Sequence, residues 1–99
     1  MTLLKWIGWC KEDNHDKVWI VQQLSGDKFS GKFVVIWGRR GKKLQTKIHD
    51  YLTMHYIERL IDSKLDKGYK SIDQKNLESI YPEFQDDLEK TTVWALLSA

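Results

Sequence analysis

The residues of this sequence best suited to chemistry are a tryptophan, an arginine and a set of lysines between positions 28 and 47. This stretch holds seven basic residues and no acid, whereas three bases face four acids in residues 1–27 and six face ten in residues 49–99. The seven are Lys28, Lys32, Arg39, Arg40, Lys42, Lys43 and Lys47. Clustered cations in an otherwise near-neutral chain are typical of a phosphate-binding surface. A solvated sheet face that aids solubility is the alternative explanation.

Trp37 and Arg39 belong to KFVVIWGR (residues 32–39), which has the β-branched and aromatic composition of a strand. Alternation along a strand places these two side chains on one face, with Gly38 and Arg40 on the other. An indole stacks on a sugar or base, and a guanidinium pairs with phosphate oxygens. Because apolar side chains occupy both faces of this strand, alternation allows Trp37 to be either a core residue or an exposed binding residue.

A meander of strands followed by helices is expected to position these residues. Alternating or β-rich segments bounded by turn residues predict strands near 4–9, 17–24, 32–39 and 44–48. From Asp50 to Leu65, apolar residues including Tyr51 and Leu60 recur at helical spacing, which predicts an amphipathic helix. Asp50 is the expected N-terminal cap, and Lys67-Gly68 ends the helix. Residues 69–72 are expected to be extended.

The C-terminal quarter of the chain is expected to be helical. One helix would begin after a cap at Asp73 and end before Pro82, and a third would carry Phe84 and Ala95. We therefore expect an α+β fold, a single antiparallel sheet of about four to five strands packed against an amphipathic helix. Residues 1–72 would form the domain, and 73–99 a helical extension that packs on or completes it. Dimerisation through this extension is the alternative.

Several segments of the chain resemble the WGR domain, a family found in poly(ADP-ribose) polymerases and in bacterial proteins. The resemblance is carried by KVWIVQQL (17–24), KFVVIWGRRG (32–41) and LDKGYKSI (65–72), and it covers about residues 5–72. It implies a compact sheet-and-helix module that, in the polymerases, engages damaged DNA near a strand end and relays that contact to neighbouring domains. Family members usually have an aliphatic residue where Arg40 stands. Either Arg40 joins the phosphate surface here, or the contact of this chain differs.

On this resemblance, Trp37 would lie against a terminal sugar or base and Arg39 would contact backbone phosphate. Gly38 would let the backbone approach the ligand, because glycine has no Cβ. The remaining residues of the expected nucleic-acid-binding set are Arg40, Lys42, Lys43, Lys47, Lys28 and Lys32. The sequence contains no transferase region, so we expect no catalytic residue and no enzymatic activity.

Other reactive residue types have structural explanations. His49 and His55 are six positions apart, which does not match the i, i+4 spacing of helical metal ligands, and His15 lies in an acidic turn. Cys10 belongs to no recognised nucleophile pair, and Asp86-Asp87 suits the start of a helix. We therefore expect no metal and no cofactor. The tryptophans other than Trp37 are assigned to packing: Trp6, Trp9, Trp19 and Trp94.

A single cysteine, with no export signal and no segment of about 20 apolar residues, favours a cytoplasmic or nuclear protein that is neither secreted nor in a membrane. The hypothesis is a non-catalytic accessory module that binds nucleic acid, DNA rather than RNA. It would bind ends, nicks or junctions through backbone phosphates and tryptophan stacking. The alternative is a protein–protein interaction module that docks an acidic partner or a neighbouring domain. The oligomeric state is open.

Overall fold

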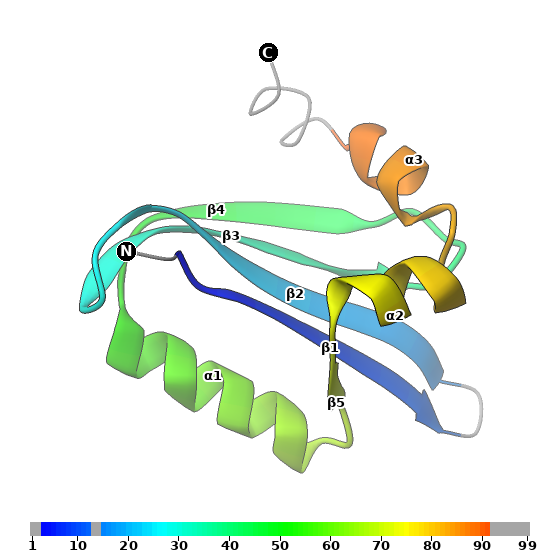
Figure 1. Ribbon diagram of the computed structural model, residues 1–99, viewed down its shortest axis with the longest axis horizontal. Helices are drawn as coiled ribbons and strands as arrows, with labels where there is room; N and C mark the ends of the chain where they lie inside the picture. The colour runs from blue at the N-terminus through cyan, green and yellow to red at the C-terminus, as the bar shows by residue number, and fades with distance from the viewer. Residues whose placement is uncertain (1–2, 13–14, 92–99) are drawn as a thin grey trace.

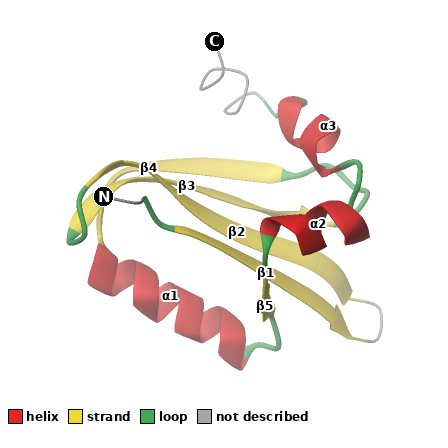
Figure 2. Cartoon of the chain, viewed as in Figure 1, coloured by secondary structure: helices red, strands yellow, loops and turns green. Residues whose placement is uncertain are grey.

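A computed structural model describes residues 3–12 and 15–91. Five strands form one antiparallel sheet in the order β4-β3-β2-β1-β5 (Figure 1). The strands are β1 Lys5–Glu12, β2 His15–Gly26, β3 Ser30–Arg39, β4 Gln45–Thr53 and β5 Lys70–Ile72. The helices are α1 Met54–Asp66, α2 Gln74–Ile80 and α3 Phe84–Glu89 (Figure 2). The predicted α+β class with one antiparallel sheet is confirmed.

The fourth strand is longer than the sequence pattern predicts, and helix α1 begins later. Asp50 and Tyr51 are strand residues, so the prediction that Asp50 caps the helix is wrong. Thr53 is the cap, and its hydroxyl oxygen accepts a hydrogen bond from the backbone N–H of Tyr56 at 3.2 Å. Strand β4 stays paired with β3 as far as Ser30↔Thr53, and this pairing provides hydrogen bonds for the backbone N–H and C=O groups of the segment. The spacing of apolar residues within the segment gives no information on this partner strand.

The apolar stripe of α1 is narrower than predicted. Ile57 is fully buried, and Leu60 and Ile61 are half-buried against the same cluster, whereas Leu65 is 45% exposed. The predicted end of the helix is confirmed: Lys67 is the cap, and Gly68 has φ +98°, a left-handed conformation that suits glycine.

Both faces of the sheet are apolar, in keeping with the apolar side chains that alternation places on both faces of residues 32–39. Alternation along β2 places Val18 and Ile20 on one face and Trp19 and Val21 on the other. Helix α1 covers the face of Trp19, and α2 and α3 cover the face of Val18 (Figure 1). The arrangement has three layers, helix, sheet and helix.

The segment expected to extend the domain supplies part of its core. Asp73 caps α2 as predicted, accepting a hydrogen bond from the backbone N–H of Asn76 at 2.8 Å. Side chains from α2, α3 and the turn between them join the β2 and β3 residues in one cluster: Leu77, Tyr81, Phe84 and Leu88. Helix α3 ends at Glu89, and the predicted continuation to Ala95, like Trp94, lies outside the described residues. Within the part described, no helix is long and apolar enough to span a membrane.

Candidate nucleic-acid interface

Trp37 lies on the α1 face of β3, half-buried, between two adjoining hollows. The first hollow, of about 570 Å³, is lined by Asp16, Lys17, Trp19, Trp37, Gly38, Arg39, Lys64 and Tyr69. The second hollow, of about 260 Å³, is lined by Trp19, Val35, Trp37, Lys47, His49 and Lys64. Because Trp19, Trp37 and Lys64 line both, the two hollows adjoin across these three side chains.

The pairing of strands β2, β3 and β4 places these side chains together. Lys17 is opposite Arg39, and Trp37 is flanked by Trp19 on β2 and Gln45 on β4. Directly paired residues of antiparallel strands project to the same face. Lys47 and His49 reach this face in the same way, opposite Val35 and Phe33. Helix α1 contributes Lys64 from its last turn, and Tyr69 follows just before β5.

Two lysines lie against the aromatic lining of the first hollow. The Nζ of Lys64 is 5.3 Å from the centre of the Trp19 ring and 5.8 Å from that of Tyr69, and the Nζ of Lys17 is 5.8 Å from the Tyr69 ring. These are cation–π distances. Behind them, the Trp6 ring packs 5.8 Å from Trp19. The lining is therefore supported by a packed aromatic layer.

The first hollow is electrostatically suited to an anion. Among the described residues, neither Lys17 nor Lys64 has an acidic group within ion-pair distance. Burial, followed by the charges of Lys67 and Lys17, lowers the pKa of Lys64. A bound anion would offset the repulsion and the loss of hydration that disfavour the charged amine. Burial raises the pKa of Tyr69, which favours its protonated phenol in the hollow.

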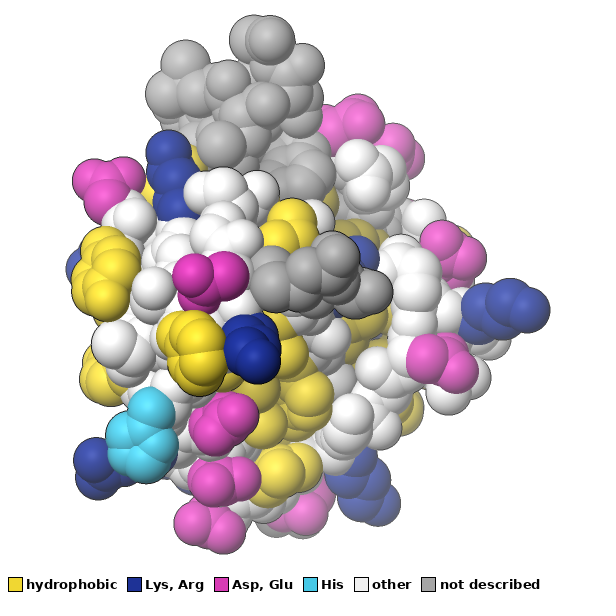
Figure 3. All heavy atoms as spheres, turned by 60° about the vertical axis from the view of Figure 1, so that its left-hand side comes forward, with side chains coloured by type: hydrophobic (Ala, Val, Ile, Leu, Met, Phe, Trp, Pro, Cys, Tyr) yellow, Lys and Arg dark blue, Asp and Glu magenta, His cyan; other side chains and the backbone are white. Residues whose placement is uncertain are grey.

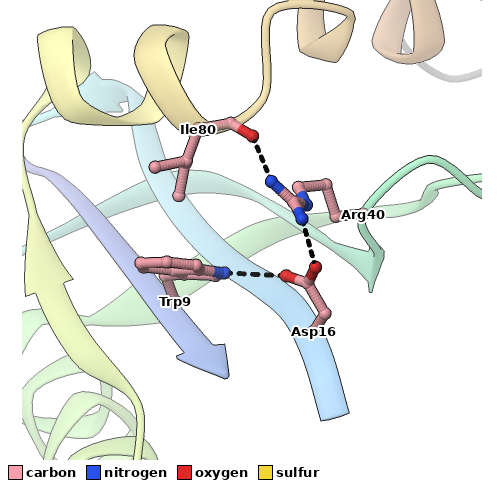
Figure 4. Close-up of polar contacts among 4 residues, drawn as sticks. All are labelled: Trp9, Asp16, Arg40 and Ile80. Atoms are coloured by element: carbon pink, nitrogen blue, oxygen red, sulfur yellow. Dashed lines mark hydrogen bonds and ion pairs between the residues drawn. The ribbon is translucent and has the colours of Figure 1, made fainter. Parts of the chain in front are cut away.

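Arg40 lines neither hollow, and its guanidinium contacts protein groups instead of facing the surface where phosphate was expected. Its guanidinium pairs with the Asp16 carboxylate at 2.6 Å and donates a hydrogen bond to the Ile80 backbone carbonyl (Figure 4). The indole N–H of Trp9 donates to the same carboxylate at 2.9 Å. The network joins β1, β2, the end of β3 and the end of α2 on the opposite face. We assign Arg40 a structural role.

Arg40→Ala should destabilise the fold by about 1–3 kcal/mol, because it leaves the half-buried Asp16 and the Ile80 carbonyl short of a partner. Burial raises the pKa of Asp16, but the Trp9 hydrogen bond and the Arg40 charge outweigh it, so the pKa is lowered. The stability from this lowered pKa is present at neutral pH and is lost as pH falls below about 4. Thermal melts from pH 3 to 7 should show the difference between wild type and variant shrinking with acid. Equal melting curves at pH 7 would contradict the structural role.

The basic stretch 28–47 does not form one surface. Arg39 and Lys47 line the hollows. Lys28 lies in the β2–β3 turn at the opposite end of β3 from Arg39, with its Nζ 5.1 Å from the Phe29 ring. Lys32 lines neither hollow, and Lys42 and Lys43 line a separate hollow beside α3. Residues that follow one another along a hairpin are divided between the two faces and the two ends of the sheet. A count of charges along the sequence therefore overestimates how many cations share one surface.

The structure explains the glycine at position 38 by packing against Leu44 and not only by the expected approach to a ligand. Its φ is +153°, and a Cβ at this position would lie 3.1 Å from the Leu44 side chain and 3.3 Å from the Leu44 Cα. Leu44 is buried in the cluster under α2 and α3. The glycine therefore lets the chain between β3 and β4 pack closely, although its backbone also borders the first hollow.

No family model, curated protein or solved structure matches this chain. The resemblance to the WGR domain stays a hypothesis that rests on the motifs of the sequence. In residues 3–12 and 15–91, no three His, Cys, Asp or Glu side chains are grouped as metal ligands would be.

Sequence reasoning missed several residues of the two hollows: Lys17, Trp19, His49, Lys64 and Tyr69. Trp19 is 6% exposed, as its assignment to packing implies, yet its remaining surface lines both hollows. Lys17 and Trp19 are two positions apart on one strand and therefore share a face, and this spacing was the one signal in the sequence that could have placed them together. Lys64 comes from the last turn of a helix, so its position depends on how that helix crosses the sheet.

Proposed function

We propose that this protein is a non-catalytic nucleic-acid-binding module that holds one DNA strand, at an end, nick or junction, on the α1 face of the sheet. The observation that carries the proposal is a half-buried indole between two hollows bordered by cations. Asp16 is the one acid that borders them among the described residues, and its carboxylate is held by Trp9 and Arg40.

In this proposal, one side chain stacks on a base and the others contact phosphates. Trp37 offers a flat apolar surface, worth roughly 1–3 kcal/mol per stacked base. Arg39, Lys17 and Lys64 surround the same hollow and suit phosphate oxygens, with Arg39 able to form two parallel hydrogen bonds. Phosphate neutralisation releases counterions, so binding should weaken steeply with added salt.

A protein-interaction module is the second candidate, and a different surface favours it. Phe29 and Tyr51 are 69% and 68% exposed near the β2–β3 turn and the end of β4, and Tyr56 is exposed at the start of α1. Figure 3 shows hydrophobic side chains exposed among acidic and basic ones on this end of the molecule. Exposed aromatic residues are typical of protein interfaces. This surface does not include Trp37, so the two candidates can be tested separately.

Arg39→Ala and Lys64→Met should each weaken binding to a labelled single-stranded oligonucleotide without a large change in melting temperature. Each should make the slope of log affinity against log salt shallower by about 0.7, the value for one phosphate contact on a single strand. Anisotropy titrations at several salt concentrations measure both quantities.

Lys28→Ala is the matched control, because it removes one exposed cation far from the hollows. It should leave the affinity and the slope close to wild type. Slopes unchanged in both site variants, or reduced as much by Lys28→Ala, would count against the proposal.

A further inference from the structure

The second hollow adjoins the first and is the smaller of the two. Its volume is about 260 Å³, against about 570 Å³ for the first. It shares Trp19, Trp37 and Lys64 with the first hollow and adds Lys47 and His49 from β4. A flat ring with one adjacent anionic group fits this lining. The second hollow is therefore best explained as an extension of the first.

Arg39 and Lys47 come from opposite ends of this surface. Arg39 lies four residues along β3 from Val35, whose partner on β4 is Lys47. Four residues of strand span about 13 Å, and the step to the neighbouring strand adds sideways distance. This backbone separation exceeds the rise of about 3.4 Å between consecutive stacked nucleotides, so the surface has length for more than one nucleotide.

Strand β4 is at the edge of the sheet, and among the described residues no other strand pairs along its outer side. A polynucleotide that leaves the second hollow past Lys47 would therefore meet solvent rather than another layer of protein. Lys47 itself is exposed, and His49 is half-buried. The surface is therefore open at the β4 edge, as a path for a continuing strand requires.

We propose that the second hollow binds the nucleotide next to the one in the first hollow, so that the surface follows an unpaired strand across β3 to the edge at β4. This inference rests on the proposed function. The nucleotide is unpaired because a base must leave its duplex stack to reach an aromatic side chain. Trp37 would then separate two successive nucleotides, and Lys47 would contact the phosphate beyond it.

The test compares a DNA duplex carrying a one-nucleotide unpaired extension with the same duplex carrying a two-nucleotide extension, of either polarity. Wild-type protein should bind one of the two-nucleotide extensions about fivefold or more tightly than the one-nucleotide extension of the same polarity, as one added stacked base would give. A Lys47→Ala, His49→Ala double variant should lose this preference. Lys47→Met alone should lose part of the preference, which guards against a folding defect in the double variant. Arg39→Ala should weaken binding to both duplexes, and Lys28→Ala should weaken neither.

The possible failures are distinguishable. Wild-type protein that binds neither duplex nor a single-stranded oligonucleotide would overturn the proposed function itself. Equal wild-type affinity for the one- and two-nucleotide extensions would overturn only the role of the second hollow. So would a folded double variant that loses affinity for both duplexes by the same factor, or that keeps the full preference.

Discussion

Ile57→Ala is expected to lower the free energy of unfolding by about 2–5 kcal/mol, the range for an aliphatic side chain truncated to alanine in a packed core. Ile57 is 0% exposed and is the buried residue of α1. It packs in one cluster with Trp19 and Phe33, so its truncation would leave a cavity beneath the helix that supplies Lys64. Urea unfolding followed by circular dichroism measures this loss as a lower midpoint with an unchanged slope.

The two leucines of α1 provide graded controls for this prediction. Leu60 is half-buried against the same cluster, so Leu60→Ala should cost less than Ile57→Ala. Leu65 is 45% exposed, and Leu65→Ala should cost less than either. An Ile57→Ala protein as stable as Leu65→Ala would mean that α1 is not packed on the sheet with this face.

Trp37→Leu is expected to lower the affinity for single-stranded DNA by roughly 1–3 kcal/mol, which is the measured range for losing one aromatic stacking partner. Leucine keeps an apolar side chain in the half-buried position, so the protein should remain folded and lose less stability than Ile57→Ala. Anisotropy titrations with a labelled oligonucleotide measure the affinity, and thermal melts confirm folding.

Trp6→Leu is the matched control, because Trp6 is also half-buried in the same cluster but lines neither hollow. It should lose stability, since its ring packs on Trp19, with less effect on binding than Trp37→Leu. Equal losses of affinity in the two variants would indicate that the binding defect follows from packing rather than from stacking on Trp37.

Local signals in the sequence were enough to predict most elements of the fold. The alternation in β2 and β3, the Asp73 cap and the glycine at position 68 act over a few residues, and each prediction is confirmed. The error at Asp50 has a non-local cause. The pairing of β4 with β3 extends through Tyr51, and helical spacing within the segment cannot detect a partner strand far away in the sequence.

The candidate site was less predictable, because strand register and helix crossing create it. Alternation correctly placed Trp37 and Arg39 on the same face. The register that puts Lys17 opposite Arg39 cannot be read from either strand alone. Arg40 is adjacent to Arg39 but projects to the other face, where Asp16 and Ile80 bind it. Arg40 was therefore included in the expected phosphate-binding set, although in the structure its guanidinium pairs with the Asp16 carboxylate.

A titration of labelled single-stranded DNA with wild-type protein and Trp37→Leu, at low and high salt, distinguishes stacking on Trp37 from charge attraction alone. Wild-type protein should bind at low salt, and its affinity should fall steeply as salt rises, because bound phosphates release counterions. The ratio between the two proteins' affinities should be similar at both salt concentrations, because stacking is not a counterion effect. No binding by wild-type protein at low salt, or a folded Trp37→Leu protein that binds as tightly as wild type, would contradict the proposed interface.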